Sequence, residues 1–205
     1  MIRILLADDH EIVRDGLKRI LAATSDLRVE GEASSGDQAL ALARANDYDI
    51  AMLDMSMPGL SGIDLIKRLK GEKPKLRLLV LSMHGEQQYA ARALKAGASG
   101  YLTKDSAAEQ LVGALRKIAA GGVHISEAAA AGLVAAQQAP HQALSDREFE
   151  VLRLLATGLS PTQIGERLHV SVKTVSTHKA NVLEKLSLGS TAELVRYALE
   201  HKILQ

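Results

Sequence analysis

The sequence predicts an α/β protein, a doubly wound five-stranded parallel sheet, joined to a second, smaller all-α domain. Short aliphatic runs alternate with amphipathic helical stretches over residues 1–122. This alternation builds a parallel sheet with helices on both faces. Beyond a linker at 123–143, residues 144–205 carry only helix signals. We therefore expect two domains, at 1–122 and 144–205.

The first domain contains five strand-helix repeats. The first helix shows the helical period clearly, with apolar residues along one face from Ile12 to Leu21. The same alternation predicts strands at 2–7, 28–33, 49–53, 76–81 and 99–102, and helices at 11–23, 36–45, 61–70, 86–96 and 106–119.

The linker begins after Gly121-Gly122, which end the last helix of the first domain. Its alanines predict a short helix at 127–136, and the segment around Pro140 lacks any apolar period. A linker without an apolar stripe offers no surface for rigid docking. We therefore expect a small and mobile interface between the domains.

Four serines are placed where helices of the second domain should begin, because a serine hydroxyl accepts a hydrogen bond from the first turn of a helix. Two of them have a glutamate three residues later and so predict capping boxes. The second and third helices are separated by a short turn at His169-Val170, the geometry of a helix-turn-helix. The serines are Ser145 (with Glu148), Ser160 (before Pro161), Ser171 and Ser190 (with Glu193).

Composition excludes several kinds of function. The chain has no cysteine, which rules out disulfides and thiolate metal sites and suits a reducing cytoplasm. Aromatic residues are only 2% of the chain, so nucleic-acid binding by base stacking is not expected. Charge is nearly balanced, with a net value of +1, and no apolar stretch is long enough for a membrane span. Any DNA contact must come from a local cluster of charges.

Polar residues follow four of the predicted strands. Asp8 and Asp9 follow the first strand, Asp54 the third, Ser82 the fourth and Lys104 the fifth. Because the carboxyl ends of parallel strands meet at one rim of a sheet, these side chains should lie together. Taken singly, each has a plainer interpretation: the first two aspartates could cap a helix, and the lysine could be a solvated charge.

Three carboxylates at one site repel one another unless a cation holds them. Oxygen ligands at a cleft that also receives phosphate favour Mg²⁺. With Mg²⁺ and Lys104, the charge of the three aspartates sums to zero, and the site can accept a dianionic phosphoryl group.

Across 1–122 these residues, with the segments DMSMPGLSG and GYLTKD, resemble the flavodoxin-like receiver domain of two-component response regulators. The resemblance implies that Asp54 accepts a phosphoryl group from a phosphohistidine on a sensor histidine kinase. It also implies that Asp9, Asp54 and the backbone carbonyl of Ser56 hold Mg²⁺, with Asp8 acting through water.

The resemblance gives Lys104 the role of pairing with the phosphoryl oxygens. It implies that Ser82 turns its hydroxyl toward the phosphate and that Tyr101 swings inward as a switch, although a packed core tyrosine is the plainer reading. Most receivers have proline after the lysine, in a cis peptide, whereas this chain has Asp105. The flanking residues Ser56 and His84 are expected to control how fast water removes the phosphoryl group.

The segment from Leu144 to Leu186 resembles the helix-turn-helix of LuxR/NarL-type (FixJ-like) regulators, with the LSxRExEVL and TVxxH signatures. The resemblance implies binding to double-stranded DNA, as a homodimer when phosphorylated. We expect the dimer contact to lie partly in the last helix, at Val195 and Leu199. Val172, Val175, Val182 and Leu186 should form the buried side of the recognition helix. Lys173 and Lys179 should contact phosphates, and Ser176, Thr177 and Ala180 should face base edges.

The sequence therefore favours a cytoplasmic, phosphorylation-controlled transcription regulator that is not an enzyme. Two other classes stay open. A haloacid-dehalogenase-type phosphatase also forms an aspartyl phosphate, but needs a second acid two residues later, where this chain has Ser56. Alternatively, the helical domain could bind proteins, in which case its retention on DNA would lack a strong salt dependence.

Overall fold

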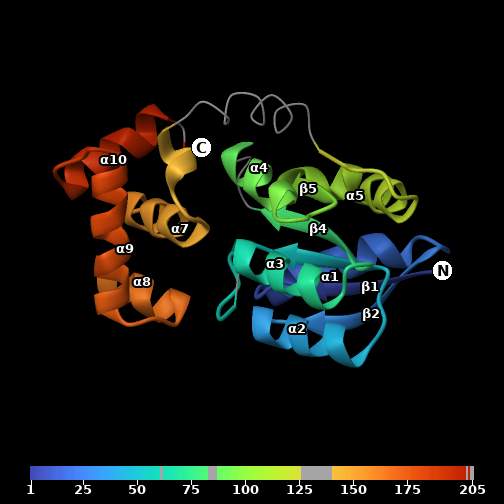
Figure 1. Cartoon of the computed structure of the whole chain (residues 1–205). Helices are drawn as coiled ribbons and strands as arrows, with labels where there is room; N and C mark the ends of the chain where they lie inside the picture. Colours follow the sequence, from blue (N-terminus) through green and yellow to red (C-terminus); the bar gives the residue numbers. More distant parts are fainter. Residues whose placement is uncertain (61, 83–86, 126–139, 202, 204–205) are drawn as a thin grey trace.

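The structure, a computed structural model, describes residues 1–60, 62–82, 87–125, 140–201 and 203. Its first half contains a parallel five-stranded sheet with the strand order β2-β1-β3-β4-β5 (Figure 1). This arrangement confirms the predicted fold class. The strands are β1 (Ile2–Ala7), β2 (Leu27–Ala33), β3 (Ile50–Asp54), β4 (Arg77–Ser82) and β5 (Gly100–Thr103).

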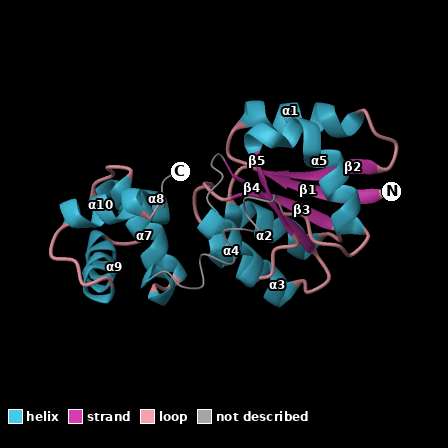
Figure 2. Ribbon diagram, turned by 90° about the horizontal axis from the view of Figure 1, so that it is seen from above, coloured by secondary structure: helices cyan, strands magenta, loops and turns pink. Residues whose placement is uncertain are grey.

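Helices cover both faces of the sheet. Helices α1 and α5 lie over one face, and α2, α3 and α4 lie over the other (Figure 2). Their bounds are α1 (Glu11–Ala22), α2 (Gly36–Ala45), α3 (Gly62–Glu72), α4 (Gln87–Lys95) and α5 (Lys104–Ala119). The helix expected at 127–136 lies outside the described residues.

Each strand contributes to two cores, because successive side chains of a strand point to opposite faces. In β1, Ile4 and Leu6 pack with α1 and α5, whereas Leu5 and Ala7 pack with the helices of the other face. All five residues of β3 are buried. The centre of the sheet is therefore buried on both faces, and β1 and β3 lie side by side there and end at one rim.

Helix α5 begins at Lys104, two residues before the predicted start. The side chain of Thr103 accepts a hydrogen bond from the backbone N–H of Ser106, so the threonine caps the helix. The described part of the chain contains no cis peptide bond, so the bond between Lys104 and Asp105 is trans. The chain therefore passes from β5 into α5 at Lys104 through trans peptide bonds.

The second half is a group of four helices preceded by a short 3₁₀ helix, η1 (Pro140–Ala143). The turn between the second and third of these helices passes through His169, which adopts the left-handed conformation at φ 52° and ends the second helix. The α-helices are α7 (Asp146–Ala156), α8 (Pro161–Leu168), α9 (Val172–Lys185) and α10 (Thr191–Glu200).

In the second half, the predicted helix starts are confirmed, with one correction to the capping. Ser145 and Glu148 form the expected capping box. Ser190 caps α10 as expected, but the Glu193 carboxylate accepts its hydrogen bond from the N–H of Gly189 instead of closing a box with Ser190. A second complete capping box joins Ser160 to the glutamine three residues later.

Among the described residues, no helix has both the length and the apolar character needed to cross a membrane.

Candidate functional site

Three aspartates meet at the carboxyl ends of β1 and β3, as the sequence predicts. Asp8 and Asp54 are fully buried, and Asp9 is exposed. One potential ligand atom from each of these residues and from His10 lies within 4.8 Å of the others. The N-cap of α1 is His10, and its side chain makes no capping hydrogen bond, so the helix-capping interpretation of the aspartates is not what the structure shows.

His10 was not singled out by the sequence analysis. Its Nδ1 atom lies 2.8 Å from Asp9 Oδ1 and 3.3 Å from Asp8 Oδ1. Its backbone N–H also donates to Asp8 Oδ1 at 2.9 Å, which fixes the orientation of that buried carboxylate. Its position directly after two acids was the signal that could have identified it.

Lys104 reaches the aspartates from the start of α5. Its Nζ atom lies 2.6 Å from Asp8 Oδ2 and 3.2 Å from Asp54 Oδ2, and the side chain is only 8% exposed. One ammonium group therefore contacts two buried carboxylates, which leaves a surplus of negative charge. Burial raises the pKa of Asp54, the attraction of Lys104 opposes this shift, and the charge of Asp8 adds to it.

The loop that follows β3 carries Ser56 two residues after Asp54, and it is held against the start of α2. The N–H of Gly36 donates to the carbonyl of Pro58 at 3.3 Å. A Cβ atom on Gly36 would lie 1.4 Å from the carbonyl oxygen of Leu60, so only glycine permits this approach. The tight packing fixes the loop that presents the Ser56 carbonyl.

Ser82 and Tyr101 lie on the neighbouring strands β4 and β5. Ser82 ends β4, is partly buried, and pairs in register with Thr103, the residue before Lys104. The ring of Tyr101 is 2% exposed and packs in the core under α4. His84 lies outside the described residues.

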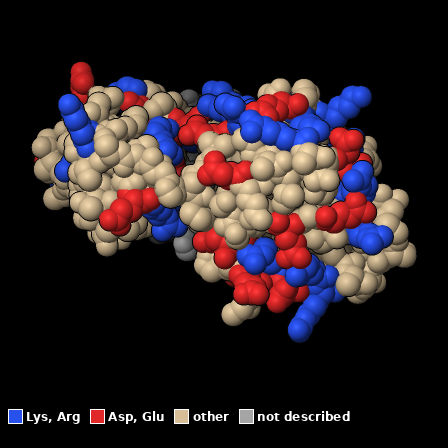
Figure 3. Space-filling view, turned by 90° about the horizontal axis from the view of Figure 1, so that it is seen from below, with Lys and Arg blue, Asp and Glu red and all other residues tan. Residues whose placement is uncertain are grey.

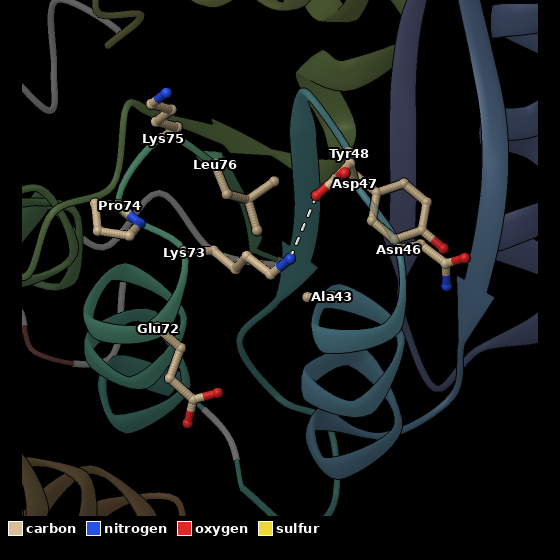
Figure 4. A pocket seen from close by; sticks show the side chains of 9 residues that line it. All are labelled: Ala43, Asn46, Asp47, Tyr48, Glu72, Lys73, Pro74, Lys75 and Leu76. Carbon is tan, nitrogen blue, oxygen red and sulfur yellow. Dashed lines mark hydrogen bonds and ion pairs between the residues drawn. The ribbon is translucent and has the colours of Figure 1, made fainter.

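A cavity of about 310 Å³ lies at the opposite rim, before β3 and β4 (Figure 4). It is bounded by the ring of Tyr48 and by Pro74, and Lys73 Nζ contacts Asp47 Oδ1 at 3.3 Å at its edge. The aspartate cluster lies at the other ends of these strands, so this cavity is separate from the site.

Helix α9 presents a polar surface, as expected for a recognition helix. Lys173, Ser176, Thr177 and Ala180 are exposed, and Lys179 is partly exposed. The hydroxyls of Ser176 and Thr177 donate to backbone carbonyls four residues earlier, at 2.9 and 3.0 Å. Each hydroxyl oxygen is thereby turned outward as an acceptor.

The buried side of α9 is formed by Val175, Val182 and Leu186. The assignment of Val172 to this side was wrong, because Val172 is 44% exposed. It is the first residue of the helix and extends past the core. His178 is partly buried, in keeping with a packing role.

Lys185 is 41% exposed, but its ammonium group is already paired within the protein. Its Nζ atom donates to Glu148 Oε2 at 2.7 Å. Burial raises the pKa of Glu148, but the hydrogen bonds from Lys185 and Ser145 outweigh burial and lower that pKa to about 2. The lysines left for DNA are therefore Lys173 and Lys179.

On the face shown in Figure 3, acidic and basic side chains are intermixed, so no single charge sign dominates it.

Two family descriptions match this chain. The response regulator receiver domain matches residues 4–116, and the luxR family of bacterial regulatory proteins matches residues 142–198. Response regulator UvrY of Escherichia coli K12 is 33% identical over 98% of this chain and 95% of its own length. Response regulator GacA of Pseudomonas aeruginosa is 35% identical over 98% and 97%, respectively.

Solved structures agree with the sequence relatives. A complex of the two-component response regulator RcsB with DNA is 30% identical, covers 96% of both chains and has a TM-score of 0.64. Another structure of RcsB, from Salmonella typhimurium, has a TM-score of 0.78 at 30% identity over 96% of both chains. The chain therefore belongs to the two-component response regulators that join a receiver domain to a luxR-type DNA-binding domain.

Proposed function

We propose that Asp54 is the phosphoryl acceptor of this regulator and that a sensor histidine kinase is the donor. The contact of Lys104 with both Asp8 and Asp54 carries this proposal. A buried ammonium beside a buried carboxylate is placed to pair with phosphoryl oxygens once they are attached to that carboxylate. The extent of the receiver is proposed as 1–122, of the linker as 123–143, and of the DNA-binding domain as 144–205.

The donor set fits Mg²⁺. The cluster offers three carboxylates against the single ammonium of Lys104, and oxygen donors suit a hard divalent cation. Asp9 and Asp54 would hold the ion directly with the carbonyl of Ser56, and Asp8 would act through water. When bound, Mg²⁺ neutralises charge on the phosphoryl oxygens.

The transfer itself needs little from the protein beyond position and charge. An Asp54 carboxylate oxygen forms a bond to phosphorus as the bond from phosphorus to the imidazole nitrogen of the donor breaks. The electron pair of the broken bond stays with that nitrogen. Lys104 then pairs with the transferred oxygens, and Ser82, at the end of the neighbouring strand, turns its hydroxyl toward them while Tyr101 acts as the switch.

For DNA, the exposed residues of α9 have separate roles. Lys173 and Lys179 anchor phosphates, which gives affinity without sequence preference. Ser176, Thr177 and Ala180 face base edges in the major groove. Pairing of two chains through α10 would present two such helices, and the proposed location is the cytoplasm.

The test is phosphorylation by a small phosphodonor in the presence of Mg²⁺, followed by intact mass measurement. One phosphoryl group should be added to the wild type and none to Asp54→Asn. Labelling that survives this substitution would overturn the assignment of Asp54.

A further inference from the structure

Arg92 of α4 is buried where the two halves of the protein meet. Its guanidinium group donates to the backbone carbonyls of Leu144 and His141, at 3.0 and 2.7 Å. It also pairs with the Asp146 carboxylate at 3.1 Å and lies 4.3 Å from the centre of the Phe149 ring. A receiver side chain that is only 8% exposed is therefore held by four groups of the DNA-binding half.

From Arg92, one path of polar contacts leads to the recognition helix. Asp146 is the first residue of α7 and follows the N-cap Ser145. The N–H of Ser145 donates to Glu148 Oε2 at 2.8 Å, and Lys185 near the end of α9 donates to the same oxygen at 2.7 Å. A displacement of Arg92 would therefore disturb the start of α7 and, through Glu148, α9.

A second path leads to α10. His141, whose carbonyl accepts from Arg92, has a fully buried ring, and its Nδ1 atom lies 2.9 Å from the hydroxyl of Tyr197. The Tyr197 ring lies 4.2 Å from that of His201. Arg92 thus contacts the helix start that supports α9 and the residue that packs against α10.

On the receiver side, α4 is the helix that follows β4 and its terminal Ser82. It also packs against β5, which carries the buried Tyr101. Both proposed switch residues are therefore on strands that adjoin α4. A rearrangement of Ser82 and Tyr101 would therefore reach α4 directly.

We propose that Arg92 is the positioning residue that couples phosphorylation of Asp54 to DNA binding. The planar guanidinium of Arg92 tolerates little displacement. Its partners are two backbone carbonyls, a carboxylate at the start of α7 and a ring within α7. A shift of α4 therefore either breaks the Arg92 contacts or moves α7 and η1 with it. In both cases the relative placement of the two halves changes in discrete steps.

This inference rests on the proposed function. It is tested by measuring how strongly phosphorylation changes the affinity of the protein for DNA. We expect the ratio of DNA affinities with and without phosphorylation to be on the order of fivefold or more in the wild type. In Arg92→Ala it should fall below about twofold, with Asp54 still fully phosphorylated. Arg92→Lys keeps the charge but lacks the planar fork, and should lose most of the coupling as well.

The matched control is Arg68→Ala, which removes an arginine of α3 whose guanidinium pairs with Glu72 of the same helix. Its affinity ratio should equal that of the wild type. A wild-type ratio retained in both Arg92 variants would overturn the role of Arg92 alone. Failure of the wild type to bind DNA or to be phosphorylated would overturn the proposed function, and this inference would fall with it.

A second measurement reports the docking directly. Because the chain has no cysteine, spin labels can be attached at Lys75→Cys and Glu200→Cys, which are exposed positions in the two halves. The distance distribution should be narrow in this double variant and broad when Arg92→Ala is added. An unchanged distribution in a folded Arg92→Ala protein would contradict a docking role for the side chain.

Discussion

The ammonium nitrogen of Lys104 lies 2.6 Å from a carboxylate oxygen of Asp8, and both side chains are almost completely removed from solvent. The same nitrogen also contacts Asp54. Breaking such a buried pair on one side leaves an uncompensated charge, which costs more than the loss of a surface ion pair.

Replacement of Lys104 by methionine is therefore expected to destabilise the receiver by about 3 kcal/mol in the absence of divalent ions, because two buried carboxylates lose their cation. Millimolar Mg²⁺ should restore part of this loss, since an ion that binds only the folded state stabilises it. Urea unfolding with and without Mg²⁺ measures both effects. Equal stability of the variant and the wild type in the chelated state would contradict the electrostatic role of the lysine.

His141 predicts a dependence of stability on pH in the DNA-binding half. Burial lowers the pKa of His141 to about 4, and the charges of His201 and Arg92 add to this shift. Between pH 6.5 and 4 the unfolded chain takes up a proton that the folded chain refuses, so the free energy of unfolding falls as the pH falls. One pKa unit corresponds to about 1.4 kcal/mol, so the loss should approach roughly 3 kcal/mol.

In His141→Asn the part of this pH dependence due to the ring should disappear. His169→Asn is the matched control, because His169 is an exposed helix end in the left-handed conformation, which asparagine tolerates. Chemical unfolding at pH 7 and pH 4.5 makes the comparison. A pH dependence equally reduced in both variants would count against His141 as its source.

Lys179 and Thr177 should affect DNA binding in different ways. Lys179→Ala should weaken binding to all sequences alike and lower the slope of log K against log salt by about 1. Thr177 donates its hydroxyl proton to the carbonyl of Lys173, so its oxygen is an acceptor. It should therefore favour adenine or cytosine, whose amino groups donate in the major groove.

Competition binding on randomised sites at two salt concentrations separates these effects. Lys75→Ala, a change at an exposed lysine in the receiver, serves as the control and should leave both slope and preference unchanged. A Thr177→Ala protein with the wild-type base preference at every position would refute the base contact.

Leu199 of α10 is 57% exposed and Val195 of the same helix is partly exposed, which leaves an apolar surface for a second chain. Leu199→Glu should leave the monomer stable but reduce the affinity for paired half-sites at least tenfold, while binding to one half-site persists. Val123→Glu changes an apolar residue of similar exposure outside the helical half and should have no effect. Footprints of each variant on paired and single sites decide the matter.

Much of the receiver could be predicted from sequence because its strands are short, apolar and regularly spaced. The first strand was placed at its observed bounds, and the others within one residue at each end. Once the strands are parallel, geometry alone brings Asp8, Asp54 and Lys104 to one rim. Predicting the fold was therefore enough to predict that these three side chains lie together.

The contact between the halves was not predicted. The linker alone suggested a small and mobile interface, whereas the structure shows Arg92 of α4 buried against the start of α7 and Lys67 of α3 paired with Asp146. An arginine on an amphipathic helix has the pattern of a solvated residue, and only the tertiary arrangement shows that it is buried.

In the proposed mechanism, a phosphoryl group on Asp54 controls DNA binding by α9. The most direct measurement is the affinity of the full chain for its DNA site with and without a small phosphodonor and Mg²⁺, for the wild type and for Asp54→Asn. The donor should raise the affinity of the wild type and have no effect on the variant. An equal response of the two proteins, or the lack of any response in a wild type shown by mass to be phosphorylated, would contradict it.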